Sequence, residues 1–412
     1  MTPRSSAHSF WRASSSRCSA SRSASPMRTF LLALLALAAP GALAQAAVTV
    51  TVANPLDQPR PDAVAEVPWA TLSAALPGLG PDAVRVIDPA TEAEVVSQPL
   101  DLDADGTPEH LLILTGLWPN ETRAFRVEAV APDSAYAPRV HAMHDDYRDD
   151  MAWESDRIAW RTYGKGLWEA DEFQPLVSSG IDVWPKRTRD LITERWYEKG
   201  HDAYHIDSGE GADFYSVGTT LGAGGTGVWA DGDLVRPENF DGWRILADGP
   251  IRAVFEMDYG PFDAGGQSVS ETKRITIDAG RHLYRQESTY TADGPVPAVV
   301  GLVDRPEGVV ASTRDGADWT WLALWGPVER KNGGHGELGT AVIVPSAALG
   351  RTAREGRHYL ATVDATPGVP VVSYVGAGWT ASGDVDSVAD WWALLDAEAA
   401  RLGAPVVVTV GE

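Results

Sequence analysis

Two arginines and a tyrosine alternate along one short segment that ends at Tyr163. If the segment is a β-strand, Arg157, Arg161 and Tyr163 share one face, because side chains alternate between the two faces of a strand. Guanidinium groups make a poor hydrophobic core, but they offer a planar fork of donors to a carboxylate. The segment is therefore predicted to bind an anionic ligand. The alternative is a structural ion pair with the neighbouring acids Glu154 and Asp156.

Residues 197–227 combine histidines, tyrosines and acids with many glycines, which predicts a loop. Within it, His205 and Tyr215 are candidates for transferring protons, because burial or nearby charges shift the pKa of such groups. Glu210 and Asp213 are candidates for contacts with a substrate. The alternative is an ordinary polar loop whose acids are solvated.

His335 and Trp379 are two further candidates, each set among glycines. His335 lies in a Gly-Gly-His-Gly segment, where a ligand can approach the backbone closely. Trp379 is one of 16 tryptophans, and an aromatic ring can stack on the apolar face of a sugar. Metal ligation by His205, Asp207 and His335 is left as an alternative, because no two histidines have a spacing typical of a metal site.

Two motifs resemble cofactor or metal sites but are incomplete. Residues 101–106 have the D-x-D-x-D-G start of a calcium loop, yet the twelfth position is Leu112 instead of a bidentate glutamate. Residues 222–227 match the G-x-G-x-x-G pattern of dinucleotide sites, but a turn-rich segment follows in place of a helix. We predict no cofactor and assign no metal ligand.

Composition and charge restrict the class of protein. The 412 residues are 44% hydrophobic and 22% charged, as in globular proteins. A net charge of −23 argues against nucleic acid or an anionic membrane as the main partner. The one cysteine, Cys18, lies in the N-terminal segment, so no disulfide is expected in the remaining chain.

Residues 1–44 are predicted to be a signal peptide with an upstream extension. Arg28 precedes an apolar run that starts at Leu31, and Ala42-Leu43-Ala44 is a small-residue cleavage site before Gln45. No other apolar run reaches the ~18 residues of a membrane span. We expect a periplasmic or secreted protein without a membrane span.

Period-two patterns predict an all-β fold. Residues 45–131 are expected to form a small N-terminal β-sandwich, and residues 140–412 a large antiparallel supersandwich that contains the site. In the larger domain, strands are predicted at 157–163, 251–259, 268–278, 282–290, 319–325, 340–344, 359–363 and 371–375. One helix is predicted, because Ser387 and Asp390 form a capping box and Gly403 ends the apolar period.

Five segments resemble the family named domain of unknown function 4861. They are WESDRIAWRTYG at 153–164, GIDVWPKR at 180–187, YHIDSGEGADFYSVG at 204–218, GPIR at 249–252 and YVGAGW at 374–379. Members of this family occur among bacterial polysaccharide-degradation genes, and one subgroup is similar to the oligosaccharide dehydratases of ulvan breakdown. Residues 251–290 also resemble the supersandwich of galactose mutarotases and several polysaccharide lyases.

The resemblance implies a carbon–oxygen lyase that eliminates water, or a glycosyl group, across C4–C5 of a uronic acid in acidic oligosaccharides. Such a reaction needs a group that neutralises the carboxylate, a base for the C5 proton and an acid for the leaving group. On this resemblance, Arg161 with Arg157 or Lys186 would hold the carboxylate. His205 and Tyr215 would move the protons, with His335 as a substitute.

Two alternatives are kept. A glycoside hydrolase acting on the same sugars would need two carboxylates ~5–9.5 Å apart, which Glu154, Glu210 and Asp213 could supply. A non-catalytic carbohydrate-binding protein would use the tryptophans and would leave the His, Tyr and Arg clusters without a role. The products formed from uronic acid oligosaccharides distinguish these possibilities.

Overall fold

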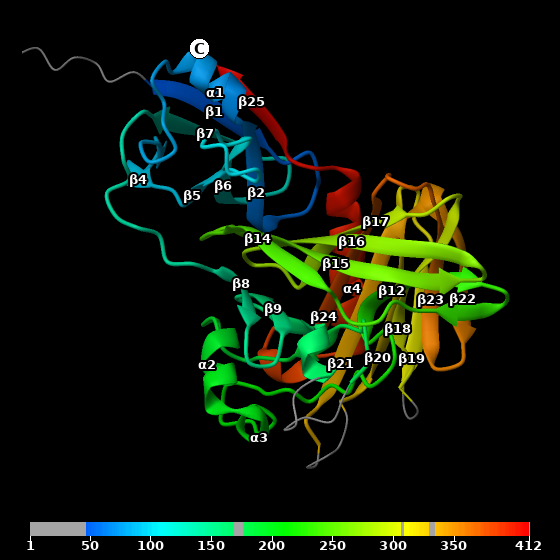
Figure 1. The fold of residues 1–412 in the computed structure, drawn as a ribbon. Coiled ribbons are helices and arrows are strands. Elements are labelled where there is room, and N and C mark those ends of the chain that lie inside the picture. Colours follow the sequence, from blue (N-terminus) through cyan, green and yellow to red (C-terminus); the bar gives the residue numbers. More distant parts are fainter. Residues whose placement is uncertain (1–46, 169–175, 306–308, 329–333, 412) are drawn as a thin grey trace, which may run out of the picture. The chain divides into compact units, whose positions relative to one another are not determined.

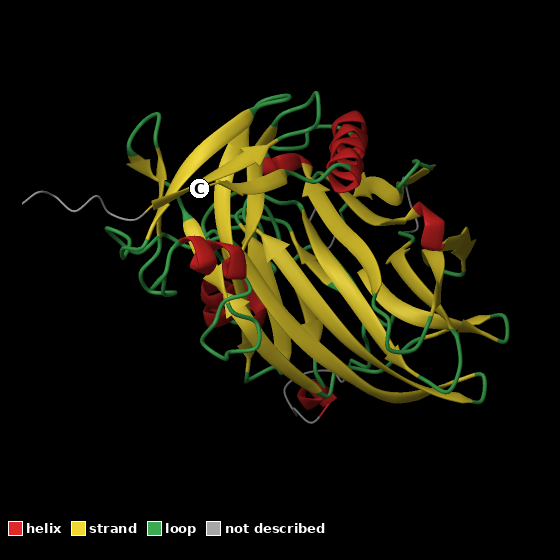
Figure 2. Ribbon diagram, turned by 90° about the horizontal axis from the view of Figure 1, so that it is seen from above, coloured by secondary structure: helices red, strands yellow, loops and turns green. Residues whose placement is uncertain are grey.

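Antiparallel β-sheets make up most of the chain (Figures 1 and 2). The computed structural model describes residues 47–168, 176–305, 309–328 and 334–411. The chain divides into two units, Met1–Ala44 and Gln45–Glu412, and the predicted signal peptide lies outside the described residues. The sheets of the second unit confirm the predicted all-β sandwich fold.

The N-terminal region contains two sheets that face each other across an apolar core. One has the strand order β25 (Val407–Gly411), β1 (Ala47–Ala53), β7 (Thr122–Glu128), β3 (Arg85–Asp88) and β4 (Ala93–Glu94). The other has the order β2 (Arg60–Pro68), β6 (His110–Leu117) and β5 (Ser97–Leu100). Alternate residues point inward, including Val50 of β1, Val67 of β2 and Ile113 of β6.

The last strand of the chain belongs to this N-terminal sheet. We expected the second domain to extend to the C-terminus, but β25 pairs with β1 in antiparallel register, with Val408 opposite Val52. The partly buried Val408 and Val410 pack on the core of the small sandwich. The two ends of the described chain are therefore neighbours in one sheet.

Two larger sheets form the second sandwich. The eight-stranded sheet has the order β14 (Gly242–Asp248), β15 (Arg252–Ala264), β16 (Gln267–Asp278), β17 (Leu283–Thr291), β24 (Val371–Trp379), β21 (Glu337–Pro345), β20 (Trp319–Pro327) and β19 (Val310–Arg314). The five-stranded sheet has the order β13 (Asp233–Val235), β12 (Ala223–Ala230), β18 (Val296–Val303), β23 (His358–Ala365) and β22 (Leu349–Glu355). The strands β15, β16, β17, β20, β21, β23 and β24 overlap seven of the eight predicted strand segments of this domain, and all but β21 begin within one residue of the predicted start.

A third, four-stranded sheet shares the core of this sandwich. Its order is β11 (Asp182–Trp184), β10 (Ala159–Tyr163), β9 (Asp150–Ser155) and β8 (Val140–Asp145). Trp153 and Trp160 lie on its inner face, fully buried, and contact Tyr284 of the large sheet. One continuous apolar core therefore fixes the four-stranded sheet against the large one.

The helices are few, and one matches the predicted helix. They are α1 (Trp69–Ala75), α2 (Thr193–Lys199), α3 (His201–Tyr204) and α4 (Val388–Gly403), with short 3-10 turns at Lys165–Trp168, Ser346–Ala348 and Thr380–Ser382. In α4 the Ser387 side chain accepts a hydrogen bond from the Asp390 amide, as the capping box predicts. Trp391 and Leu395 bury the apolar side of α4 against the outer face of the large sheet.

Some local predictions differ from the structure, among them the predicted loop 197–227, which begins with the end of α2 and the helix α3. The strand predicted from Arg157 begins only at Ala159, because Ser155 and Ile158 join their backbones in a turn. The glycine-rich segment predicted as a loop is the start of the buried strand β12. Gly224 has a positive φ of 99°, and a Cβ there would lie 2.4 Å from Val375. Glycine allows this close approach of two strands.

No helix within the four described ranges has the length and apolar character needed to cross a membrane.

Candidate functional site

The outer face of the four-stranded sheet is polar and covered by short helices. Arg161 lies outside the tryptophan core and pairs with Asp182, while Tyr163 packs in that core and donates its hydroxyl to the same Asp182 at 3.2 Å. Across the ladder, Arg161 stands opposite Asp182, and Tyr163 stands opposite Asp150. The helices α2 and α3 cover this face with Tyr197 and other aromatic side chains. The result is a buried polar layer beneath two helices.

Arg161 lies at the centre of this layer and is bound on several sides. Its Nη2 donates to Asp182 Oδ2 at 2.9 Å and to Asp213 Oδ2 at 2.8 Å, and its Nε also donates to Asp182. Its Nη1 donates to the Tyr204 hydroxyl at 2.9 Å and lies 3.6 Å from Asp150 Oδ2. With 9% of its side chain exposed, this guanidinium is held by structural partners. Its geometry favours the ion-pair alternative over direct contact with a substrate.

Three carboxylates surround this one guanidinium. The side chains of Asp150, Asp182 and Asp213 are each 1% exposed. Burial raises the pKa of Asp150 to about 7 and also raises the pKa of Asp182. Since removing charges from water is unfavourable, burial favours the protonated form of these two acids, while the charge of Arg161 opposes it. Asp150 is thus a group that changes charge near neutral pH.

His205 follows α3 at the edge of this layer. Its Nδ1 lies 2.9 Å from the backbone oxygen of Asp213 and 3.4 Å from that residue's Oδ2. A carbonyl oxygen only accepts, so this bond places the proton on Nδ1 and leaves the lone pair of the neutral ring on Nε2. The side chain is 33% exposed, and its ring contacts those of Tyr204 and His201. This arrangement suits a general base.

Tyr215 is buried. Its hydroxyl is enclosed and has no hydrogen-bond partner among the described residues. Burial raises the pKa of this phenol, with the negative charge of Asp182 acting in the same direction. The phenol therefore keeps its proton at neutral pH. The charge of Asp182 connects Tyr215 electrostatically to the layer around Arg161, although no hydrogen bond within the described part of the chain joins the Tyr215 hydroxyl to His205.

His335 and Trp379 lie together in a second cluster. The His335 ring stacks on Phe214 with 3.9 Å between centroids, and its backbone oxygen accepts the Trp379 indole N–H at 2.6 Å. Trp379 is only 1% exposed, so it supports the His335 segment instead of forming an open platform for a sugar. Arg187 covers the Trp379 ring at 4.9 Å and pairs with Asp207.

The structure separates the remaining predicted residues from the Arg161 layer. Arg157 lies in the turn before β10 and pairs with Asp384 at 3.1 Å, so it does not share a strand face with Arg161. Lys186 is fully buried and pairs with Glu154, which also accepts the backbone N–H groups at the start of α2. This pair holds the β11–α2 connection in place, because two buried charges need each other.

Glu210 faces solvent on the other side of α2. It pairs with Arg195 and with Lys199, the latter at 3.1 Å, and accepts the Trp196 indole N–H. The sequence placed Glu210 and Asp213 together as substrate contacts. In the structure only Asp213 reaches the layer of Arg161 and His205.

The sequence analysis did not select four residues of the layer. Asp150 and Asp182 lie on strands adjacent to β10, and Tyr197 and Tyr204 come from the helices above. Tyr197 donates to Asp150 at 3.1 Å. A signal existed for Asp182, since an acid inside the short apolar segment GIDVW is unusual in a buried strand.

The acidic turn near residue 101 has a partial metal-binding arrangement. Asp101, Asp103 and Glu109 each offer an oxygen within 4.8 Å of the others, and this group alone among the described residues has such an arrangement. Backbone N–H groups of the turn donate to Asp101 and Asp103, as in an ordinary acidic turn. This turn belongs to the N-terminal sandwich, whereas His205 belongs to the second sandwich. We assign no ion to the turn.

A family model described as domain of unknown function (DUF4861) matches residues 52–408. The chain belongs to this family. The resemblance to this family that the sequence segments indicated is thereby confirmed over residues 52–408. Uncharacterized protein P7 of Formosa agariphila is 30% identical over 376 residues, which cover 88% of this chain and 93% of that protein.

Two solved structures resemble the DUF4861 chain at the level of fold. They are an alpha-mannosidase from Enterococcus faecalis V583 and a protein in glycosyl hydrolase family 38 from Enterococcus faecalis. Each has a TM-score of 0.48 and 10% identity over 89% of this chain. The chain spans about half of their length, 46% and 47%, and no function is transferred from them.

Proposed function

We propose that this protein is an exported carbohydrate-active enzyme that eliminates water, or a glycosyl group, across C4–C5 of a uronic acid in acidic oligosaccharides. The main supporting observation is the 2.9 Å bond between His205 Nδ1 and the Asp213 carbonyl. It gives a partly exposed histidine a fixed tautomer, with the basic nitrogen directed away from its anchor. The DUF4861 resemblance supplies the reaction class.

In this proposal His205 acts as the base and Tyr215 as the acid. Nε2 of His205 removes the proton at C5, and the electrons of that C–H bond form the C4–C5 double bond. The C4–O bond breaks, and the leaving oxygen takes a proton from the Tyr215 hydroxyl, giving water or an alcohol. The Tyr215 phenol carries its proton when the reaction starts, as an acid must, and its raised pKa means that the proton moves only as negative charge develops on the leaving oxygen.

The substrate carboxylate requires a cation with accessible N–H groups. Arg187 has 38% of its side chain exposed, against 9% for Arg161. We therefore assign carboxylate binding to Arg187, which lies over Trp379 beside the His335 segment. Arg161 becomes a positioning residue: it fixes Asp213, and Asp213 fixes the imidazole of His205.

The experiment is incubation of the purified protein with oligosaccharides that end in a uronic acid. The expected product is lighter by one water and has the ultraviolet absorbance of an unsaturated uronate, without new reducing ends. Absorbance with chain cleavage would identify the glycosyl-eliminating form of the same reaction. New reducing ends without absorbance would indicate a hydrolase, and binding without any product would indicate a non-catalytic protein. Either of these two results contradicts the proposal.

Two histidine variants test the assignment of the base. His205→Ala is expected to lower turnover by ~10²–10⁴-fold while the fold is retained, because a positioned base contributes about that much. His201→Ala is the matched control: it removes the neighbouring ring, which contacts His205 edge-on, and it should retain most of the activity. A folded His205→Ala protein with wild-type turnover would exclude His205 as the base.

The proposal of export has its own test. The motif Ala42-Leu43-Ala44 supports cleavage before Gln45. Protein recovered from the periplasm or medium of a bacterial host should begin at Gln45 by N-terminal sequencing. Material that begins at Met1 or Met27 would contradict it.

A further inference from the structure

A cavity of about 590 Å³ lies on the outer face of the eight-stranded sheet, away from His205. Its floor is formed by alternate residues of β15, β16, β17 and β24, whose neighbours in sequence point into the core. Its sides come from β2 and β6 of the N-terminal sandwich and from the end of α4. Cavities of roughly 300–1,000 Å³ hold small molecules in other proteins.

The cavity is rich in arginine. Six arginines line it: Arg60, Arg252, Arg274, Arg281, Arg285 and Arg401. Four acids line it: Glu66, Asp278, Glu287 and Glu398. The lining therefore has an excess of positive charge, in a chain with 34 basic and 57 acidic residues. This local reversal of the overall charge indicates a site for an anion.

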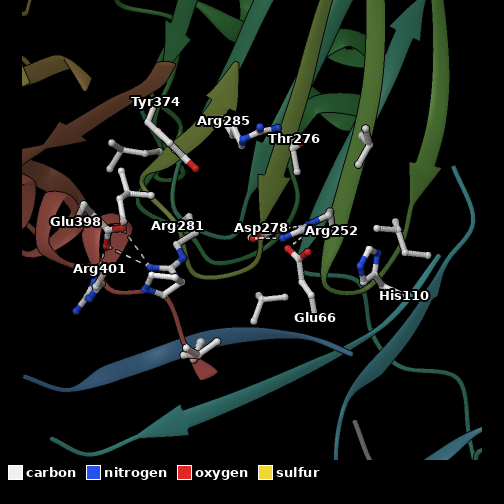
Figure 3. Close-up of a pocket in the computed structure, with 18 of the residues that line it drawn as sticks. Glu66, His110, Arg252, Thr276, Asp278, Arg281, Arg285, Tyr374, Glu398 and Arg401 are labelled. Atoms are coloured by element: carbon white, nitrogen blue, oxygen red, sulfur yellow. Dashed lines mark hydrogen bonds and ion pairs between the residues drawn. The ribbon is translucent and has the colours of Figure 1, made fainter. Parts of the chain in front are cut away.

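The strand register places the functional groups of the floor in one row. Thr276 stands opposite Arg285, and Arg285 stands opposite Tyr374, across β16, β17 and β24. Figure 3 shows these three side chains around the same space as Arg281 and Arg252. A hydroxyl, a guanidinium that also pairs with Glu287, and a phenol thus line the cavity from one rigid sheet. Rigid elements hold such a set more closely than loops do.

Part of the arginine lining is committed to structural pairs. Arg252 is clamped by Asp278 through Nε and Nη2, and its Nη1 donates to Glu66 at 2.7 Å. This contact joins the large sheet to the N-terminal sandwich. Arg281, by contrast, meets Glu398 through Nη1 alone among the described residues, at 3.2–3.3 Å. A guanidinium has five N–H donors, so Arg281 retains donors for a ligand.

The arginines also repel one another. Burial, together with the positive charges of Arg401 and Arg281, lowers the pKa of Arg60 to about 10. A bound anion would reduce this repulsion, since an opposite charge nearby favours the charged form of a base.

We propose that this cavity binds an acidic saccharide unit through its carboxylate or sulfate group, at a site distinct from the His205 centre. Planar guanidinium groups suit both anions, because each presents two or more oxygens to a fork of donors. The apolar side chains of Leu283 and Leu402 and the Tyr374 ring, which also line the cavity, provide surface for the sugar ring. The proposal goes beyond the elimination reaction: the anion site rests on the cavity lining, and the choice of a saccharide as its ligand rests on the proposed function.

The test is a binding measurement by calorimetry on the complete protein, with glucuronate, glucose 6-sulfate and glucose as probes. Glucuronate or glucose 6-sulfate should bind, and glucose should bind at least about tenfold more weakly, because hydrogen bonds to charged groups contribute most. Stronger binding of one of the two anions identifies its source as a uronic acid or a sulfated sugar. Failure of both anions to bind would overturn the proposal.

Variants then locate the binding. Arg285→Gln should weaken binding of the anion about 10- to 100-fold, and Tyr374→Phe should weaken it less. The matched control is Arg244→Gln on the edge strand β14, whose side chain is 66% exposed and which is not part of the cavity lining. Equal affinity for wild type, Arg285→Gln and Tyr374→Phe would place the anion elsewhere and overturn the proposal.

A third variant separates this proposal from the proposed reaction. His205→Ala should bind the anion in the cavity as tightly as wild type, whatever its activity on oligosaccharides. If the calorimetric signal were lost in His205→Ala but kept in Arg285→Gln, the anion would be bound at the His205 centre, and the cavity would have no such role.

Discussion

Arg161 has four hydrogen bonds to groups that are themselves buried, and this decides its contribution to stability. Removing one partner of a buried ion pair leaves the other charge without compensation. The neutral variant Arg161→Gln would leave the buried carboxylates of Asp182 and Asp213 without the positive charge that compensates them. The residue is thus more important for the fold than a surface clamp would be.

We predict that Arg161→Gln lowers the free energy of unfolding by ~3–5 kcal/mol, measured by urea unfolding. The double variant Arg161→Gln/Asp182→Asn should recover part of this loss, because it removes one of the stranded charges. The control is Arg244→Gln, at an exposed arginine whose buried partner Glu256 keeps its second pair with Arg274, and it should change stability by less than ~1 kcal/mol. Wild-type stability of Arg161→Gln would show that the layer does not depend on this charge.

The second prediction concerns Asp150 and pH. Its folded-state pKa of about 7 lies above the ~4 of an unfolded chain, so the folded protein binds the proton more tightly. Stability linked to this group is therefore present at low pH and is lost as the pH rises from about 4 to about 7. Other acids contribute with the opposite sign, which makes a difference measurement necessary.

Asp150→Asn should remove the loss of stability that the titration of Asp150 causes as the pH rises. The stability of the variant relative to wild type, from urea unfolding at several pH values, should increase between about pH 4 and pH 7 and then level off. Asp202→Asn, at a fully exposed acid next to His201, should show no such trend. A constant difference for Asp150→Asn across this range would contradict the raised pKa.

At the scale of elements, the helix α4 depends on its N-terminal cap. The Ser387 hydroxyl is bonded to both the amide and the carboxylate of Asp390. We predict that Ser387→Ala destabilises the protein by ~1 kcal/mol and increases hydrogen exchange mainly in the first turn of α4. Unchanged exchange in that turn would indicate that packing of Trp391 and Leu395 alone defines the start of the helix.

At the scale of the whole molecule, β25 joins the end of the chain to its first strand. Val408 points toward the core of the small sandwich, and the adjacent Thr409 points to solvent. We predict that Val408→Asp lowers the free energy of unfolding by ~1–3 kcal/mol, because it places a charge against an apolar core. The same substitution one residue later, Thr409→Asp, should change it by less than ~0.5 kcal/mol.

If Val408→Asp and Thr409→Asp lowered the free energy of unfolding by similar amounts, β25 would not pair with β1 in this register. Thermal unfolding and size-exclusion chromatography measure the result, since an opened edge of β1 would also promote association between chains. The pair of variants tests the strand pairing itself, because only the face of the strand differs.

Local pattern determined much of the fold. Period-two alternation is a property of neighbouring residues, so the sequence predicted strands such as β15, β16 and β17 and the common face of Arg161 and Tyr163. The cap of α4 is equally local, because Ser387 and Asp390 are three residues apart. The run from His205 to Asp213 was also recognised by its density of ionisable groups, and the structure joins these two residues.

The tertiary structure decided which partners each charged side chain has. Asp182 and Asp150 reach Arg161 from strands on either side of β10, and Lys186 meets Glu154 across 32 residues of sequence. A sequence pattern gives the face of a strand but not the strand that pairs with it. Pairing follows from register and from the burial of the whole core, which involve many distant residues at once. For this physical reason Arg161 could be predicted to lie on a polar face, while its enclosure by three aspartates became visible only in the folded chain.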